Sequence, residues 1–491
     1  MVTLPEGLPS NTSTFLAQIA AADDDGVSQL ELENISFIVT LIDRLHASYY
    51  ATFLSRSYAR ELAKKLQVES LSASFTLSGV QWKWRRRRSR GGAAEVVTAH
   101  HAIVSDFDLR AQHQLSRIGT MVANGSIGAE EGSKAMLAKR PDQRFEQLYR
   151  HPPGRQFAVA LMACGTSTIC FGGNLVDCIF ASLEGLIAGF LGMFCSEGFV
   201  ALAVSFYSVL AVNNHPETSC FRSQVIGTLF WFYFGTAFIN ALFEMASGQF
   251  RIGMARLLFA LIDSSRHAVG IAVAVVVGVM LLGEDVKELI IRDCATMESH
   301  SGKAGLSFWG IQMHIPLFLI LCVAVNSQLR VDINDWPLCV AVQAFTMISL
   351  HFCESKGRGD FQSNFIPSFL AAFSSLALLR IFGASGGQSF DHRSGSGTLR
   401  SALRYDQRDA WFCIFPSLYL LIPGSGLVKA CLFSIAGLFG FASDGIPTDF
   451  IVVLFHIGLG QVLGIGLGMA LFEIFCSRRR ASEHDTRGLP S

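Results

Sequence analysis

The chain has 491 residues, of which 51% are hydrophobic and 16% are charged, and its formal net charge is zero. Charged residues make up about a quarter of an average soluble protein, so this composition favours a membrane protein. The balanced charge argues against a nucleic-acid-binding surface. The N-terminus lacks a basic segment followed by an apolar one, and we therefore expect no signal peptide.

The first 150 residues are polar and predict a small soluble domain, either α/β or mostly helical. Residues 1–30, with three consecutive aspartates at 23–25, predict a disordered tail. Residues 31–150 form the predicted domain, on the cytosolic side of the membrane. Its predicted elements are helices over 31–70, a strand over 71–77, a second strand over 94–104, an amphipathic helix over 108–124 and a further helix from Ser126.

Two features of this domain leave alternatives open. Residues 82–90 combine two tryptophans with a run of arginines. Such a run binds anionic lipid headgroups or nucleic acid, and we favour a solvated cytosolic loop that touches the inner leaflet. The domain also holds candidates for a hydrolytic or metal site, although surface residues around a turn are the simpler interpretation: His100, His101, His113, Asp106 and Asp108.

Ten apolar segments follow from residue 156 onward, in two groups of five. They lie near 156–173, 177–195, 198–213, 222–243 and 257–282, and then near 308–326, 336–353, 364–383, 411–439 and 449–475. A polar loop over 284–307 separates the groups. The sequence therefore predicts an all-α polytopic membrane protein with about ten transmembrane helices. Its five-helix halves span 155–283 and 308–475, and a cytosolic tail spans 476–491.

Positive charge flanking the apolar segments predicts the topology, because cytosolic loops are rich in Lys and Arg. Arginines precede the first segment at 85–88, 150 and 155, and they follow the last at 478–480. An even number of helices then places both termini in the cytosol, in the plasma membrane or an internal one. The twelve cysteines form no CxxC pair, which predicts small buried residues and neither a zinc site nor a disulfide framework.

Ionisable residues inside apolar segments are costly and usually functional. Asp177 and Glu184 are seven residues apart in the second segment, so they share one helix face. Gly172 and Gly173 come just before them and predict a break or bend. Glu184 has apolar residues on both sides, which makes it a candidate proton carrier. A protonated, hydrogen-bonded structural glutamate is the alternative.

Each half also contains a stretch that combines helix breakers with polar residues, at 234–248 and 422–437. Such stretches in both halves point to a transporter binding site, whereas an apolar helix with a few tolerated polar residues is the alternative. Asn240 and Glu244 share a face, and Lys429 follows a Pro-Gly break where it would hold a substrate carboxylate. The predicted substrate and ion path comprises Gly172, Gly173, Asp177, Glu184, Gly235, Asn240, Glu244, Arg256, Pro423, Gly424 and Lys429.

Four motifs, in this order and spacing, resemble the threonine/serine exporter family, including its fungal pheromone-regulated membrane relatives. They are the helix–Asn-Gly-Ser-Ile–Glu-Glu–helix pattern over 109–137, Phe-Gly-Gly-Asn-Leu-Val-Asp at 171–177, residues 235–270, and Leu-Ile-Pro-Gly at 421–424. The resemblance covers roughly residues 35–475. Where the family usually carries Pro-Gly, this chain has Phe234-Gly235, which predicts a softer first break.

The resemblance implies ten helices in a five-plus-five arrangement behind a cytosolic domain, and export of small hydroxy amino acids or dicarboxylates. It also implies a hydrolase-like role for the N-terminal domain, for which the sequence shows no nucleophile–base constellation. We expect a secondary-active transporter, not an enzyme, that exports threonine, serine or small carboxylates with proton coupling. Asp177 and Glu184 would lie on the coupling face.

The expected partners are the small-molecule substrate, protons and membrane lipid, without nucleic acid, and a homo-oligomer is left open. We expect no cofactor and no metal. The chain lacks a GxxxxGK[ST] motif, which argues against an ATP-driven pump. Two alternatives remain open. One is a membrane-anchored hydrolase acting through residues 31–150, and the other is a non-transporting scaffold that binds partners through residues 82–90.

Overall fold

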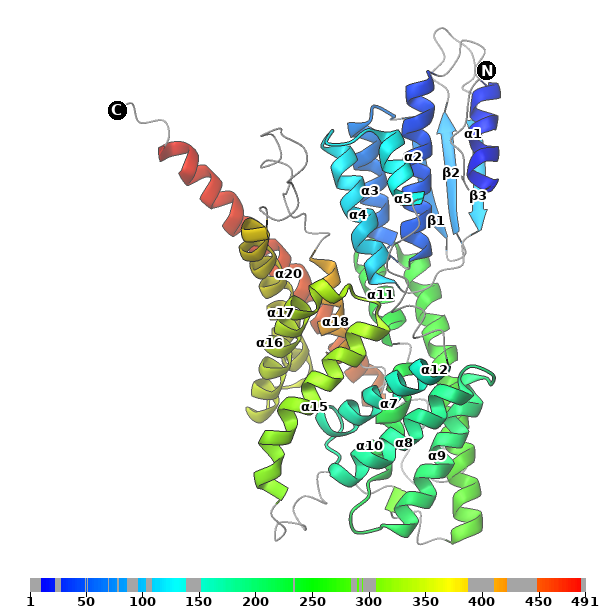
Figure 1. Ribbon diagram of the computed structural model, residues 1–491, viewed down its shortest axis with the longest axis vertical. Helices are drawn as coiled ribbons and strands as arrows, with labels where there is room; N and C mark the ends of the chain where they lie inside the picture. The colour runs from blue at the N-terminus through cyan, green and yellow to red at the C-terminus, as the bar shows by residue number, and fades with distance from the viewer. Residues whose placement is uncertain are drawn as a thin grey trace.

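Figure 1 shows the computed structural model of the chain. The structure describes residues 10–22, then 28–137 apart from 49, 51, 69, 77–78, 86–95 and 103–107, then 152–283 apart from 233–234, and then 289–290, 294, 306–386, 410–421 and 448–486. These residues are mostly helical, with one small antiparallel sheet. The prediction of a mostly helical chain with strands in its N-terminal region is therefore confirmed.

The N-terminal domain contains five helices and a three-stranded sheet of order β1-β2-β3. Helices α1, α2 and α3 contact the sheet, and α4 and α5 pack on α2. The sheet is antiparallel, with Ala73 and Ala99 opposite Trp82 on either side. Asp108 caps the following helix by accepting a hydrogen bond from Ala111 N at 2.7 Å. The elements are α1 (Ser10–Ala22), α2 (Gln29–Ala47), α3 (Thr52–Lys65), β1 (Leu71–Thr76), β2 (Gly79–Arg85), β3 (Val96–Ala102), α4 (Leu109–Ala123) and α5 (Ala129–Leu137).

Two predictions for this domain are wrong. The predicted disordered tail contains α1, whose apolar residues Phe15, Leu16 and Ile19 are fully buried. The predicted basic loop begins as a strand, because β2 continues to Arg85 and alternates buried tryptophans with exposed basic residues. Trp82 donates a hydrogen bond to Asp43 Oδ1 at 2.9 Å. The rest of the arginine run, residues 86–90, lies outside the described residues.

The remaining helices form the membrane part of the chain. Those before residue 283 are α7 (Pro152–Ile169), α8 (Leu175–Leu191), α9 (Glu197–Asn214), α10 (Phe221–Leu229), η1 (Phe230–Phe232), α11 (Gly235–Ala246) and α12 (Phe250–Leu282). Those after residue 305 are α15 (Leu306–Gln328), η2 (Ile333–Asp335), α16 (Trp336–Ser355), α17 (Asp360–Gly386), α18 (Trp411–Leu421) and α20 (Thr448–Thr486).

The chain is a multi-pass membrane protein. Within the described residues, five segments are long and apolar enough to cross a bilayer: Glu197–Asn214, Phe250–Leu282, Ile333–Cys353, Asp360–Ile381 and Phe455–Phe472. A sixth arises if the bent pair Phe221–Phe232 and Ala237–Ala246 counts as one span. Large apolar side chains on these helices are exposed, among them Met280, Ile348 and Phe352. Such a surface suits contact with lipid tails. The full set of ten spans remains a prediction.

Glycines let two long helices of the second group pack closely. Gly460, Gly464 and Gly468 on α20 lie against the backbone of α17, and a Cβ added at Gly464 would lie 2.4 Å from Phe365 O. Close backbone approach at small residues is a common mode of helix packing in membranes. Helix–helix contact is therefore a sufficient explanation of this glycine stripe.

A disulfide joins Cys220, just before α10, to Cys294 beyond the end of α12. The prediction that the cysteines form no disulfide is wrong for this pair. Its members are 74 residues apart in the sequence, and only the arrangement of the helices brings them together.

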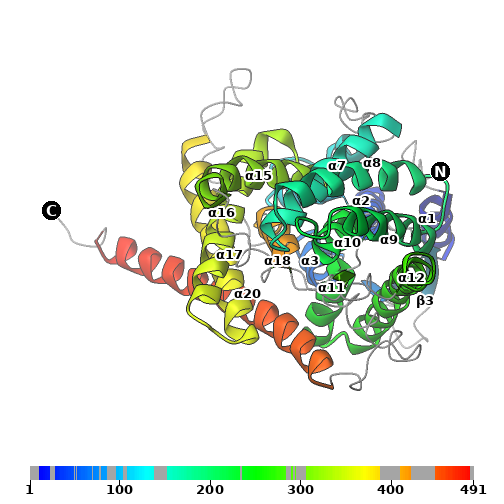
Figure 2. The ribbon, with the colours of Figure 1, turned by 90° about the horizontal axis from the view of Figure 1, so that it is seen from below.

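The N-terminal domain lies at one end of the molecule, and the last turns of α20 point toward the same end (Figure 1). Helices α8, α9 and α10 lie toward the opposite end. Viewed along the long axis, α7–α12 lie on one side, and α15, α16, α17 and α20 lie on the other (Figure 2). The described membrane helices thus form two groups, and the N-terminal domain sits at one end of both.

Candidate transport path

Gly172 and Gly173 form the turn between α7 and α8. Gly172 has φ of +66°, in the left-handed region that favours glycine. A Cβ added at Gly173 would lie 2.0 Å from Ser223 Oγ on α10 and 2.9 Å from the backbone oxygen of Ser167, so a side chain here would force the backbone to shift. The chain bends here as the sequence predicts, and the bend falls between two helices.

Asp177 is a capping residue of α8. Asn174 accepts a hydrogen bond from Asp177 N at 3.0 Å, and Asp177 Oδ2 accepts one from Asn174 N at 3.1 Å. This reciprocal pair is a capping box. The other oxygen, Oδ1, accepts from Cys220 N at 2.7 Å and from Gln224 Nε2 at 2.8 Å. Asp177 therefore ties the start of α8 to the start of α10, close to the disulfide.

We expect Asp177→Ala to lower the free energy of unfolding by about 2 kcal/mol or more, because it removes the cap and leaves buried donors without an acceptor. Thermal unfolding of the purified protein in detergent measures the change. Asp177→Asn keeps one acceptor oxygen and should lose less stability. If the alanine variant unfolded at the wild-type temperature, this structural role would be wrong.

Glu184 lies two turns further along α8 and is fully buried. Its carboxylate accepts a hydrogen bond from Ser208 Oγ on α9 at 2.5 Å and one from Thr228 Oγ1 on α10 at 2.9 Å. Among the described residues, no cation forms an ion pair with it. Hydroxyl groups can donate to a carboxylate and accept from a carboxylic acid. These partners can therefore accommodate both protonation states of Glu184.

The chain bends between α10 and α11, directly before the second part of the path. Helix α10 and the 3₁₀ turn Phe230–Phe232 meet α11 at 63°. Gly235 is the first residue of α11 and is buried. The bend directly before Gly235 is strong although no proline is present, so the prediction of a softer first break is wrong.

Beyond this bend, Glu244 and Arg256 form a buried ion pair. Arg256 Nη1 on α12 lies 2.9 Å from Glu244 Oε1 on α11, and both side chains are at most 5% exposed. Thr52 Oγ1, from helix α3 of the N-terminal domain, donates to the same oxygen at 2.6 Å. A buried charge pair needs such additional hydrogen bonds to offset its desolvation.

Several polar atoms around this ion pair have no hydrogen-bond partner among the described residues. They are Glu244 Oε2, Asn240 Oδ1 and both ring nitrogens of His46. Asn240 lies one turn before Glu244 on α11 and is 1% exposed. Unpartnered buried polar groups are costly and are usually satisfied by water or a ligand. The cluster therefore has the donors and acceptors to receive a small polar molecule.

Burial, together with the smaller effect of the nearby Arg256 charge, lowers the pKa of His46 from 6.5 to about 4. Between about pH 6.5 and pH 4 the unfolded chain gains a proton at this residue that the folded protein does not. The free energy of unfolding is therefore not reduced by His46 above about pH 6.5, and it declines as the pH falls below that value. We expect a loss of about 3 kcal/mol by pH 4.

This loss should be absent in His46→Gln. The measurement is the free energy of unfolding of the wild type and of this variant across this pH range, and the difference between them is the contribution of His46. Burial raises the pKa of Asp43 in the same domain, which contributes the opposite slope, and the difference removes that contribution. Parallel curves for wild type and variant would show that His46 is not buried in its neutral form.

The predicted residues of the second half, Pro423, Gly424 and Lys429, lie outside the described residues. In the N-terminal domain, His101 Nδ1 lies 2.5 Å from Asp43 Oδ2 in the domain core. His113 lies at the domain surface, 3.4 Å from Asp335. No group of three or more His, Cys, Asp or Glu residues that could hold a metal occurs in the described part of the chain.

The structure adds residues that the sequence analysis did not single out. Thr52 reaches the ion pair from the N-terminal domain, and His46 of the same domain lies near enough to Arg256 for its charge to act on the imidazole. Ser208 and Thr228 hold Glu184. Serine and threonine are common in apolar helices, so their presence alone does not mark a functional site in the sequence. Gln224, a buried amide three residues before Gly227, is the exception. Its polarity in an apolar segment could have marked it.

Comparison with known proteins adds one finding. Residues 45–278 match the model of the ThrE family, which is described as "Putative threonine/serine exporter". This match covers the end of α2, the rest of the N-terminal domain and nearly all of the helices that carry Asp177, Glu184, Glu244 and Arg256. No curated protein and no solved structure matches the chain. Over residues 45–278, slightly less than half of its length, the chain is similar to the threonine/serine exporter family, as the resemblance of its motifs predicts.

Proposed function

We propose that the protein is a secondary-active transporter that exports small amino acids such as threonine or serine, or small carboxylates, with proton coupling. The observation that carries this proposal is the buried Glu244–Arg256 pair, which lies next to unpartnered polar atoms and a bend in the chain. Bent or broken helices beside buried polar groups are typical of transporter substrate sites. The family match supports the transport class.

An α-amino acid fits the charges of this cluster. Its carboxylate would face Arg256 and its ammonium group would face Glu244, so each buried charge would exchange its present partner for a substrate charge. Arg suits a carboxylate because its planar guanidinium can donate two parallel hydrogen bonds. A side-chain hydroxyl could donate to Asn240 Oδ1, which has no partner among the described residues. A dicarboxylate would leave Glu244 facing a like charge, so we favour the amino acid.

Glu184 is the proposed proton carrier. It lies in the membrane part, fully buried between Ser208 and Thr228. Asp177 lies two turns away in the first turn of α8, where its Oδ1 accepts a hydrogen bond from Cys220 N just before α10. The proposed path therefore runs from Asp177 past Glu184 and the bend before Gly235, to Glu244 and Arg256 beneath the N-terminal domain.

We propose ten membrane crossings with both termini in the cytosol. Helices outside the segments that meet the length and hydropathy criterion, such as α7, α8, α15 and α18, would then cross together with those segments. The disulfide Cys220–Cys294 supports this orientation, because disulfides form in oxidising compartments. Cys220 lies directly before α10, and α10 lies toward the end opposite the N-terminal domain (Figure 1), which leaves the domain on the reducing, cytosolic side.

Substrate exchange tests the proposed function. Proteoliposomes loaded with unlabelled threonine, serine or succinate would receive the labelled compound outside, and uptake by exchange would be followed over time. We expect exchange of threonine or serine, and its loss in Glu244→Gln. Ser57 is exposed on α3, away from the path, so Ser57→Ala serves as the control. Absence of exchange for all three compounds in a folded, reconstituted protein would contradict the proposal.

A further inference from the structure

The N-terminal domain touches both groups of membrane helices. Its first contact is with the ion pair described above, where Thr52 Oγ1 donates to Glu244 Oε1 at 2.6 Å and lies 3.1 Å from Gln249 Oε1. Thr52 is fully buried at this junction. The domain therefore covers the end of the proposed path on its own side of the molecule.

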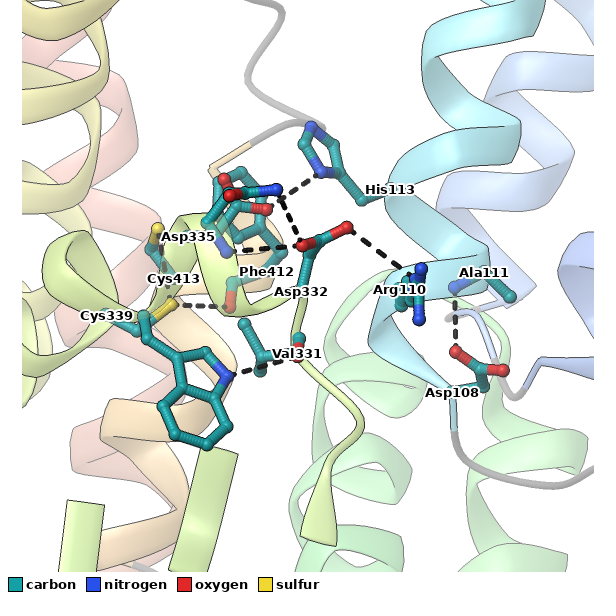
Figure 3. Close-up of polar contacts among 12 residues, drawn as sticks. Asp108, Arg110, Ala111, His113, Val331, Asp332, Asp335, Cys339, Phe412 and Cys413 are labelled. Atoms are coloured by element: carbon teal, nitrogen blue, oxygen red, sulfur yellow. Dashed lines mark hydrogen bonds and ion pairs between the residues drawn. The ribbon is translucent and has the colours of Figure 1, made fainter. Parts of the chain in front are cut away.

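Its second contact joins the start of α4 to the segment between α15 and α16 (Figure 3). Leu109 N donates to Leu329 O at 3.2 Å, and Arg110 N donates to Arg330 O at 3.1 Å. These amides belong to the first turn of α4, where backbone N–H groups have no partner within the helix. Backbone carbonyls of this segment thus accept hydrogen bonds from the free amides at the N-terminus of α4.

Side chains strengthen this second contact. Arg110 Nε lies 3.6 Å from Asp332 Oδ2, and His113 Nδ1 lies 3.4 Å from Asp335 Oδ2. The His113 ring also stacks on Phe412 of α18, with 4.3 Å between ring centroids. In Figure 3, Arg110 and His113 point from α4 toward the two aspartates. These four side chains are between 21% and 29% exposed, so solvent can reach this contact.

We propose that the N-terminal domain is a gate for the proposed path. Thr52 closes the path at Glu244, and the α4 contact, defined as residues 109–113 with residues 329–335 and Phe412, holds the domain closed across both helix groups. The proposal rests on the proposed function for what passes through the path. The closed arrangement itself is defined by the contacts above.

The two contacts differ in strength, which sets the order of opening. The Thr52–Glu244 hydrogen bond is buried and charge-assisted, so it is shorter and stronger than a neutral one. The side-chain pairs of the α4 contact, Arg110–Asp332 and His113–Asp335, are reached by solvent, and such pairs are individually weak. A substrate whose ammonium group occupies Glu244 would compete with Thr52 for the same carboxylate. Substrate arrival therefore releases the stronger contact, and the weaker α4 contact then yields.

Cysteine labelling tests the gate without requiring transport. Thr52→Cys and the exposed control Ser57→Cys lie on the same helix, and labelling by a maleimide is read by mass spectrometry on the peptide that contains each position. We expect Thr52→Cys to label much more slowly than Ser57→Cys. Adding Asp332→Asn and Asp335→Asn should raise the rate at position 52 roughly fivefold, as the loss of two solvent-accessible side-chain pairs allows, and leave position 57 unchanged. Equal rates at the two positions, or no change at position 52, would overturn the gate.

Cross-linking then separates failure of the gate from failure of the proposed function. Cysteines at Arg110 and Asp332 would be joined by a short bifunctional methanethiosulfonate reagent. The gate predicts that exchange stops and that a reductant restores it. Full exchange in the cross-linked protein would overturn the gate and leave the transporter intact. If even the uncross-linked wild type exchanges nothing, the proposed function fails, and the labelling rates alone decide the gate.

Discussion

Arg256→Gln is expected to abolish exchange and to lower the free energy of unfolding by about 3–5 kcal/mol, because it leaves Glu244 buried without its cation. Arg256 and Glu244 are 4% and 0% exposed, so water cannot take over the missing partner. Thr52 would remain the main donor to the carboxylate. Chemical unfolding and exchange assays on the same preparation would measure both effects.

The double variant Glu244→Gln with Arg256→Gln separates stability from transport. Two neutral amides of similar volume leave no buried charge, so most of the lost stability should return. Exchange should remain absent, because neither group can pair with a charged substrate. If the single variant Arg256→Gln transported at the wild-type rate, the ion pair would be structural and the substrate site would lie elsewhere.

Glu184→Gln is expected to abolish transport driven by a pH gradient while exchange of substrate persists. Glutamine keeps a carbonyl oxygen and adds an amide donor, so the hydrogen bonds to Ser208 and Thr228 can be retained. It cannot bind and release a proton. Net uphill flux would therefore be lost without loss of the fold. Net flux and exchange, measured in the same proteoliposomes, give the comparison.

Glu197→Gln is the matched control, because Glu197 starts α9 and lies outside the proposed path. This variant should retain gradient-driven flux. Uphill transport by Glu184→Gln at the wild-type rate would remove Glu184 from the coupling mechanism. Loss of both flux and exchange, with lower thermal stability, would instead assign Glu184 a structural role.

Much of the secondary structure follows from local patterns. Apolar spacing predicts α4 within one residue at each end, and alternation predicts β1 and β3. Local patterns predict the wrong structure where a run of charged residues follows the element. The four arginines that follow Trp82 and Trp84 favour a basic loop, although the alternation of these tryptophans with Lys83 is a strand pattern. Likewise, the three aspartates at 23–25 favour a disordered tail and conceal the apolar face of α1.

The candidate site was predictable only in part. Asp177, Glu184, Asn240 and Glu244 stand out because each is polar within an apolar segment. Their partners depend on packing across long sequence separations, as for Thr52 and Glu244, which are 192 residues apart. No periodicity encodes such a contact. Likewise, the spacing of Asn174 and Asp177 fits a capping box, and the structure adds Cys220 and Gln224 as further partners.

The most direct test of the central claim is net efflux of labelled threonine or serine from proteoliposomes, with and without an imposed pH gradient. Acidic medium outside the vesicles should accelerate efflux against a substrate gradient, and a protonophore should abolish the acceleration. Efflux at the same rate with and without the gradient would contradict proton-coupled export, even if exchange of the same substrate were observed.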